Sequence, residues 1–258
     1  MAIYKVKNLS ERVAVIDADI ILYKACRVAE EEVNWGNDQW ILWSDLNKVK
    51  IILDDQIDLI VEEMKADRSI LCFSDKKNYR KEINPEYKAN RRGGRKPLCF
   101  IGALQYCKET YSFRQFTSLE ADDVMGIIAT TESNNDYVIV SEDKDLLTVP
   151  GLHWNLKTKE LYTLSEKEAD FNFFSQTLTG DTVDNYKGCP SVGKVTAEKL
   201  LRSATTKGED LWETVVNRYE KAGLAEEDAI LNARMARILR KCEYNRQTEE
   251  VKLWSPHD

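Results

Sequence analysis

Three short apolar runs that each end in an acid constrain the fold of this chain more than any other feature. The runs cover residues 12–16, 69–73 and 136–140, and they lead into Asp17, Asp75 and Asp143. Unbroken aliphatic and β-branched runs are typical of strands that are buried on both faces, as in a parallel sheet covered by helices. The carboxyl ends of such strands share one edge, where ligands bind. We therefore expect a mostly parallel α/β sheet with carboxylates gathered along one rim.

Two further acidic clusters lie outside these strands. One acid after a strand or at a helix start is ordinarily a turn or capping residue, but Glu120, Asp122 and Asp123 are more than capping needs. Asp181 and Asp184 would share one face of a helical turn. For Asp19 we expect local capping only. The expected metal ligands are Asp17, Asp75, Glu120, Asp122, Asp123, Asp143, Asp145, Asp181 and Asp184.

So many carboxylates in one site would repel one another unless cations neutralise them. Hard divalent cations prefer oxygen ligands, and two ions roughly 3.5–4 Å apart can clamp the attacking and leaving oxygens of a phosphodiester. With only two histidines, His153 and His257, the chain is poorly equipped for Ser-His-Asp or Cys-His chemistry or for a histidine-based zinc site. The sequence predicts two divalent metal ions as cofactors, Mg²⁺ with Mn²⁺ as the alternative.

A basic segment at residues 76–96 carries nine Lys or Arg and only two acids, although the whole chain has a net charge of −7. Cations bind phosphates and the interleaved Tyr79 and Tyr87 can stack on bases, so we favour nucleic-acid contact over a solvated loop. Lys76, Lys77 and Arg92 are expected to contact DNA.

The stretch Gly188–Val195 nearly matches a nucleotide phosphate-binding loop. Val195 replaces the hydroxyl that would bind Mg²⁺ and no buried strand precedes the stretch, so an ATPase is disfavoured. A helix-hairpin-helix near residues 180–202 explains it better, with Gly188, Gly193 and Lys194 offering backbone N–H groups to a DNA phosphate. We expect an α/β nuclease core over residues 1–169, with a basic arch at 76–98, and a helical DNA-binding region over residues 170–258.

Residues 33–40 are expected to form a β hairpin with its turn at Gly36–Asp38. Its tryptophans are expected to pack against the sheet, with base stacking as the alternative. The six scattered cysteines are typical of reduced thiols in a cytosolic protein. No apolar run approaches the roughly 20 residues that span a bilayer, so no membrane association is expected.

Taken in order, these segments resemble the 5′-nuclease (flap endonuclease) superfamily over nearly the whole chain. The resemblance rests on Val15-Ile16-Asp17, on Asp75 followed by the basic run Arg80 to Arg91, on Glu120 to Asp123, on Asp143 and Asp145, and on Gly180 to Asn185 leading into Gly188. Residues 235–245 and Leu253-Trp254 are similar to the end of the short exonucleases of podophages.

The resemblance implies a PIN-like 5′-nuclease fold and roles for individual residues. Lys88 and Arg91 would contact and polarise the scissile phosphate, and Arg80 and Tyr87 would position the 5′ end. The first metal would be held by Asp17, Asp75, Glu120 and Asp122, and the second by Asp143, Asp145 and Asp181, with Asp123 and Asp184 in support.

The implied function is a metal-dependent 5′→3′ exonuclease that acts on duplex DNA and removes RNA from RNA–DNA hybrids during phage replication. It would work as a monomer in the host cytoplasm, with phage replication proteins as candidate partners. A structure-specific 5′-flap endonuclease is the alternative. A catalytically silent DNA-binding relative is disfavoured because every expected carboxylate is present, and a PIN-type ribonuclease would need neither the basic arch nor the hairpin at Gly188.

Overall fold

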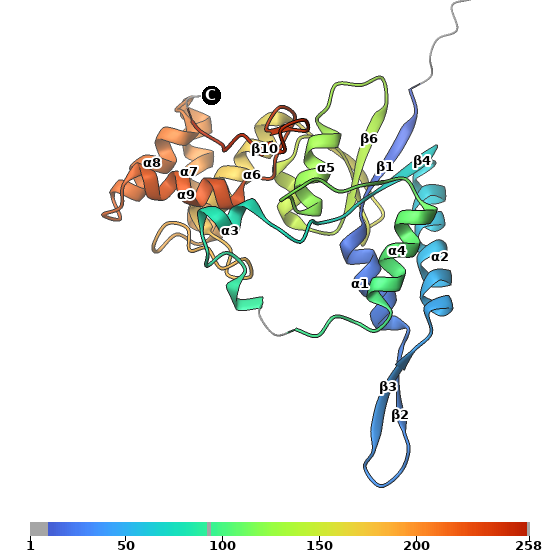
Figure 1. Ribbon diagram of the computed structural model, residues 1–258. Helices are drawn as coiled ribbons and strands as arrows, with labels where there is room; N and C mark the ends of the chain where they lie inside the picture. The colour runs from blue at the N-terminus through green and yellow to red at the C-terminus, as the bar shows by residue number, and fades with distance from the viewer. Residues whose placement is uncertain (1–9, 92–93, 257–258) are drawn as a thin grey trace, which may run out of the picture.

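The computed structural model describes residues 10–91 and 94–256. Its centre is a six-stranded sheet with the order β5-β4-β1-β6-β7-β8 (Figure 1). All neighbouring strands are parallel except the last pair, so the predicted mostly parallel sheet is confirmed. The strands are β1 (Arg12–Asp17), β4 (Arg68–Cys72), β5 (Phe113–Arg114), β6 (Asp136–Ser141), β7 (Gly151–Asn155) and β8 (Leu161–Leu164).

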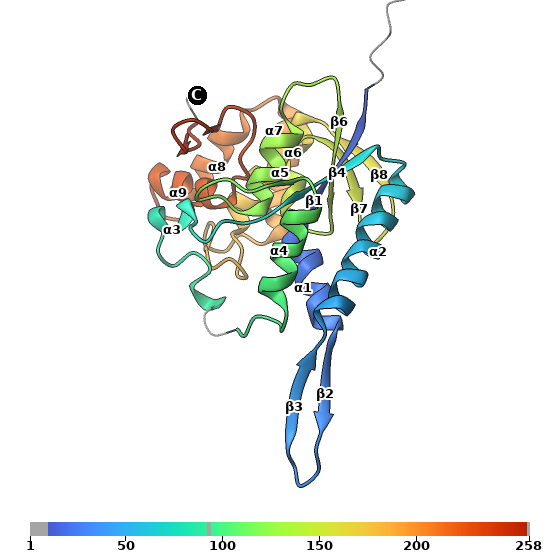
Figure 2. The same cartoon turned by 45° about the vertical axis from the view of Figure 1, so that its right-hand side comes forward.

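The central strand β1 separates two hydrophobic cores. Side chains alternate across a strand, so Ala14 and Ile16 pack into one core and Val13 and Val15 into the other. Burial on both faces explains the unbroken apolar run in the sequence. The first core is covered by α1 (Ala18–Val28), α2 (Leu46–Met64) and α4 (Phe100–Thr110), and the second by α5 (Ala121–Ala129) (Figure 2).

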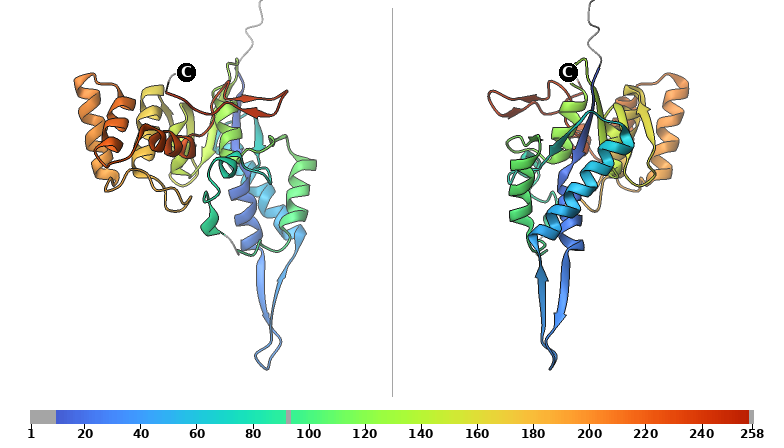
Figure 3. Two further views of the ribbon diagram at one scale, coloured as in Figure 1. Left: turned by 60° about the vertical axis from the view of Figure 1, so that its left-hand side comes forward. Right: turned by 90° about the vertical axis from the view of Figure 1, so that its right-hand side faces the viewer.

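The predicted hairpin is present as β2 (Glu30–Asn34) and β3 (Trp40–Ser44), which form a separate two-stranded sheet. The expectation that its tryptophans pack against the main sheet is wrong. The hairpin projects from the end of α1 away from the rest of the molecule, so there is no neighbouring surface for them to cover (Figure 3). Trp35 is 71% exposed and Trp40 is 57% exposed.

The basic segment leaves the end of β4 and passes through two short helices, α3 (Tyr79–Ile83) and the 3-10 helix η1 (Ala89–Arg91). After residues 92 and 93, which the structure does not describe, residues 94–98 return to α4. Arg92, one of the expected DNA contacts, therefore lies outside the described residues.

Four further helices form a separate group on the left in Figure 1, with two hydrophobic cores of their own. Residues 180–193 connect the first two of them and hold a single bridge between Asp181 and Tyr186. The helices are α6 (Glu166–Thr179), α7 (Lys194–Lys207), α8 (Leu211–Glu220) and α9 (Glu226–Ala236).

After α9 the chain returns to the α/β core. Ile238 and Leu239 are buried in the second core beside α5. A small hairpin of β9 (Tyr244–Asn245) and β10 (Glu250–Val251) follows. None of the helices in the described ranges has the length and apolar character that crossing a bilayer requires.

Candidate active site

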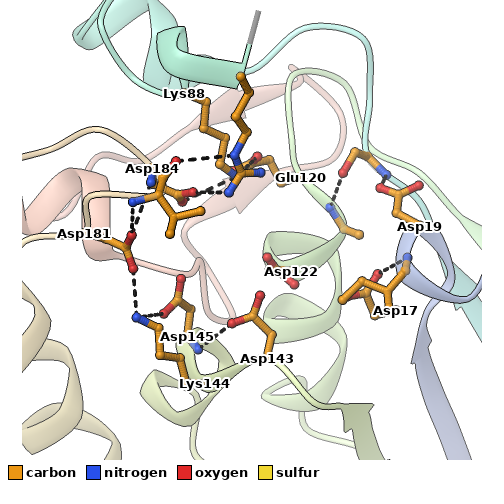
Figure 4. A pocket seen from close by; sticks show the side chains of 15 residues that line it. Asp17, Asp19, Lys88, Glu120, Asp122, Asp143, Lys144, Asp145, Asp181 and Asp184 are labelled. Carbon is orange, nitrogen blue, oxygen red and sulfur yellow. Dashed lines mark hydrogen bonds and ion pairs between the residues drawn. The ribbon is translucent and has the colours of Figure 1, made fainter. Parts of the chain in front are cut away.

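A cavity of about 330 Å³ lies where the strand ends of the sheet face the basic segment and the 180–185 loop (Figure 4). Seven of the nine acids predicted from the sequence line it, and Asp19 is an eighth carboxylate. Three cationic side chains also line it, Lys88, Arg91 and Lys144. The acids are Asp17, Asp19, Glu120, Asp122, Asp143, Asp145, Asp181 and Asp184.

Helix and turn capping position several of these acids. Asp17 ends β1 and caps α1, where its Oδ1 accepts a hydrogen bond of 3.3 Å from the amide of Ile20. Asp143 follows β6 and caps the 3-10 helix η2 (Lys144–Thr148), accepting a bond of 2.9 Å from the amide of Asp145. The capping role and the place in the cavity therefore coincide, because the helix that each acid caps starts at the rim.

One group of these acids is short of positive charge. Burial, together with Asp19 and Asp143, raises the pKa of Asp17 to about 7. Burial and the neighbouring carboxylates Asp17 and Asp143 raise the pKa of Asp122 well above its ordinary value. Burial and Asp143 raise the pKa of Asp145 to about 6. Like charges held together in a dry site favour protonation unless a cation is supplied.

A second group is already neutralised by the chain's own cations. Lys88 pairs with Glu120 and its Nζ lies 3.5 Å from Asp184 Oδ2. Arg91 Nη2 lies 2.5 Å from Asp184 Oδ1, and Lys144 Nζ lies 2.9 Å from Asp181 Oδ2. Although burial acts in the opposite direction, Arg80, Lys88 and Tyr87 lower the pKa of Glu120 to about 2.

The donor set suits a hard divalent cation, since every acid in the cavity offers oxygen and none of the lining residues offers sulfur or imidazole nitrogen. Asp17, Asp122 and Asp143 make no ion pair with any described residue, which leaves their charge for a cation to offset. Within residues 10–91 and 94–256, however, no three potential ligands already stand close enough to enclose an ion. The cavity fits metal ions by its chemistry, and the side chains would have to draw together around them.

Asp75 is placed differently from the sequence expectation. Its Oδ2 accepts a hydrogen bond of 2.9 Å from the amide of Ser118, and it lies outside the lining of the cavity. Ser74 and Asp19 occupy that part of the wall, with Asp19 Oδ2 accepting from the amide of Ser74 at 3.0 Å. The Asp-x-Asp spacing of Asp17 and Asp19 after a strand was the signal that could have identified Asp19.

The roles expected for Asp123 and Arg80 at the site are also wrong, because both side chains are buried away from the cavity. Asp123 is fully buried and Arg80 is 2% exposed. The guanidinium Nη1 and Nη2 each lie 2.7 Å from a carboxylate oxygen of Asp123. Arg80 also donates to the carbonyls of Met235 and Arg237, while Asp123 accepts from the amide of Leu239 at 3.1 Å. With these bonds made, Asp123 has no open oxygen to offer a metal and Arg80 cannot reach a DNA end.

Tyr87 is 2% exposed, so its ring is not available for stacking on a base. Its hydroxyl lies 2.9 Å from both Glu120 Oε2 and Asp184 Oδ2. Burial raises the pKa of Tyr87 above its ordinary value, and the phenol remains a hydrogen-bond donor. Tyr87 therefore joins an acid of the α5 start to an acid of the 180–185 loop. Lys76 and Lys77 are exposed at the start of the basic segment.

The glycines of the predicted DNA-binding hairpin divide into two kinds. Gly188 has a φ of +66°, and a Cβ added there would lie 2.3 Å from the amide nitrogen of Gly180. Its own amide donates to Asn232 at 2.9 Å, so it is not open to a phosphate as the sequence suggested. Gly193 and Lys194 are exposed at the start of α7, as an anion contact requires.

Comparison with known proteins identifies similar chains. Residues 12–172 match the family described as 5′-3′ exonuclease, N-terminal resolvase-like domain. The exodeoxyribonuclease of Enterobacteria phage T3 and the exonuclease of Escherichia phage T7 are each 34% identical over 282 residues, which cover 95% of this chain and 93% of the relative. The D15 protein of phage T5, crystallised with metal ions, has the same fold, with a TM-score of 0.64 and 17% identity over 87% of this chain and 88% of its own.

Proposed function

Because the chain belongs to the 5′-3′ exonuclease family and is a 5′→3′ exonuclease, we propose that it hydrolyses duplex DNA from 5′ ends with the help of two divalent metal ions. The observation that carries this proposal is the cavity in which Asp17, Asp122 and Asp143 are gathered without a cationic partner among the described residues. The RNA strand of RNA–DNA hybrids is proposed as a second substrate.

The residues that would hold the ions are the carboxylates of the cavity, with Mg²⁺ as the physiological ion and Mn²⁺ as a substitute. Bound there, divalent ions stabilise negative charge on the scissile phosphate and make water more acidic. The solved T5 relatives support this assignment, since one is a 5′-exonuclease with bound zinc and another a complex with DNA and metal ions. Ligands are proposed among Asp17, Asp19, Glu120, Asp122, Asp143, Asp145, Asp181 and Asp184.

The chain's own cations would orient the substrate. The side chains of Lys88 and Arg91 enter the cavity from the basic segment, where they form ion pairs with Glu120 and Asp184. Phosphate oxygens are acceptors of the same kind as these carboxylates, so a scissile phosphate that enters the cavity can take over the Lys88 and Arg91 contacts. The two residues would then hold the phosphate in place and offset its charge as the bond to the leaving oxygen breaks.

The rest of the duplex would be held away from the cavity. The exposed start of α7 at Gly193 and Lys194 presents backbone N–H groups and a helix N-terminus, which bind a phosphate without regard to sequence. Lys76 and Lys77 would add contacts at the start of the basic segment. A role in phage DNA replication inside the host cell, with replication proteins as partners, is part of the proposal, and the similarity to two phage exonucleases supports the phage setting.

One duplex, labelled at the 5′ end in one sample and the 3′ end in another, tests the proposal. Incubation with Mg²⁺ should release 5′-labelled mono- or short oligonucleotides early, and EDTA should abolish release. Asp143→Asn should slow release by about 10²-fold or more, whereas Asp136→Asn, an exposed acid at the other end of the same strand, should not. Shortening only from 3′ ends would refute the polarity.

Two further substrates separate the alternatives. A hybrid with a 5′-labelled RNA strand should be digested in the same manner as DNA, and an intact RNA strand would remove that part of the proposal. A duplex with a 5′ single-stranded flap tests for endonuclease action. Release of the whole flap as one product, with blunt duplex left intact, would favour the alternative function of a flap endonuclease.

A further inference from the structure

We propose that the β2–β3 hairpin is a docking surface for a basic protein, an interaction separate from the exonuclease reaction. The hairpin exposes an unusual amount of apolar surface for its size, and scattered single residues would not need this explanation. Its exposed apolar side chains are Val33 (37%), Trp35 (71%), Trp40 (57%), Ile41 (47%), Leu42 (36%) and Trp43 (48%).

The hairpin is firmly held at its base and unsupported at its tip. Glu30 Oε1 accepts from Arg95 Nη1 and from the amide of Leu98, both at 2.7 Å, and Glu30 also pairs with Arg27. At the tip, beyond these contacts, the hairpin stands clear of the body in every view (Figures 1 to 3). A two-stranded hairpin alone in water is marginally stable, so a surface of this kind gains from being covered.

Both faces of the hairpin carry exposed apolar side chains. The register pairs Val33 with Ile41 and Asn34 with Trp40. Because side chains alternate along a strand, Val33, Ile41 and Trp43 share one face, and Trp40 and Leu42 share the other. No residue of the hairpin belongs to any of the hydrophobic cores. Exposed tryptophans are the side chains that most often anchor protein interfaces.

The charge of the hairpin indicates the chemistry of the partner that it can bind. Residues 28–47 contain no Lys or Arg, and their acids are Glu30, Glu31, Glu32, Asp38 and Asp45. Nucleic-acid binding depends on cations that replace the counterions of the phosphates, so this hairpin would repel DNA despite its tryptophans. Two hairpins of two copies would bring like charges together. Glu32 and Asp38 make no ion pair in the described part of the chain, and a partner with Lys or Arg around an apolar groove complements them.

The two edges of the hairpin differ, which suggests how such a partner would attach. The sequence of β2 begins with three glutamates, and charged side chains protect a strand edge from further pairing. The sequence of β3, Trp-Ile-Leu-Trp-Ser, has no charge, and no described strand pairs with its outer edge. An extended basic segment that adds to β3 would place its apolar side chains on the face of Ile41 and Trp43 and its cations on the face of Trp40 and Glu32.

The test uses two fluorescent eight-residue peptides, one alternating Lys with Val and one alternating Glu with Val, as probes of the full-length protein in EDTA. Fluorescence anisotropy should show binding of the Lys-Val peptide only. Trp40→Thr/Trp43→Thr and, separately, Glu32→Lys/Asp38→Lys should each weaken it about ten-fold or more, while Ile101→Gln, which alters an exposed apolar residue of α4, should not. Exonuclease rate should be unchanged in all three variants.

Other outcomes would overturn the inference. Equal binding of the Lys-Val peptide to all variants would place the peptide on the acids of the cavity. A labelled single-stranded oligonucleotide that loses affinity in the Trp40→Thr/Trp43→Thr variant would make the hairpin a nucleic-acid surface. A mass of two chains by light scattering, reduced to one chain in that variant, would make it a self-association surface. Since the exonuclease assay is separate, failure here leaves the proposed function standing.

Discussion

The buried pair of Arg80 and Asp123 leads to a quantitative prediction about stability. The side chain of Arg80 is 3% exposed and that of Asp123 is fully buried. Removing one partner of a buried pair leaves an unpaired charge, whereas removing both leaves none. We therefore expect the double variant Arg80→Met/Asp123→Asn to be more stable than either single variant.

The magnitudes follow from the contacts. Losing one partner of a buried pair costs about 3–5 kcal/mol, so Arg80→Met and Asp123→Asn should each lower the free energy of unfolding by about 4 kcal/mol. The double variant leaves no unpaired charge, and its cost comes from the carbonyls of Met235 and Arg237, which lose the donor they have now, at about 1 kcal/mol each. A total near 2 kcal/mol, against a sum of about 8, is a coupling of about 6 kcal/mol.

Urea unfolding in EDTA, followed by tryptophan fluorescence and circular dichroism, measures these values in the absence of metal. A matched cycle on Lys159 and Glu63, a pair whose side chains are 42% and 31% exposed, provides the control. That pair should show a coupling below about 1 kcal/mol. Strictly additive effects at Arg80 and Asp123, or single variants that cost less than about 1 kcal/mol, would refute the interpretation of the pair as a buried structural bridge.

Three further predictions concern the helix connection, the buried histidine and the cavity. Gly180→Ala and Gly188→Ala should each lower the free energy of unfolding in urea by more than about 2 kcal/mol, because an added Cβ would meet backbone atoms at 2.4 and 2.3 Å. Gly193→Ala has open space and should lower it little, and equal losses at all three positions would contradict this prediction. Burial lowers the pKa of His153 below 6.5, so the contribution of the neutral imidazole to stability is present above that pH and is lost as pH falls. The stability difference between wild type and His153→Phe should therefore shrink from pH 7.5 to pH 5.5, and a constant difference would contradict this prediction. Lys88→Met should slow exonuclease turnover by about 10²-fold, whereas the control variant Lys76→Met should remain active. Calorimetry should show that Lys88→Met still binds Mn²⁺, and loss of metal binding would assign Lys88 a different role.

The part of the site that could be predicted from sequence is the part fixed by strand ends. Asp17 and Asp143 follow buried strands, and parallel strands bring their carboxyl ends to one rim whatever the rest of the chain does. The acids at the start of α5 could not be assigned in this way. Successive residues of a helix point about 100° apart, so Glu120 and Asp122 reach the cavity while Asp123 points into the core.

The expectations that proved wrong depend on contacts between residues that are distant in sequence. Arg80 is drawn inward by Asp123 and by carbonyls more than 150 positions further on. The tryptophans of the hairpin follow a correctly predicted turn, but whether a hairpin lies on the sheet or leaves it depends on where α1 ends relative to the body. Local patterns carry no information on either point.

The bonds from Arg80 to residues 235 and 237 also affect the order in which the molecule is completed during translation. The six strands of the central sheet and every acid of the cavity are synthesised before those residues. Arg80 holds Glu120 through a contact of 3.2 Å and is itself fixed by carbonyls that a nascent chain lacks until α9 has left the ribosome. The last two of the bonds that hold Arg80 beside the start of α5 therefore form only after α9 has been synthesised.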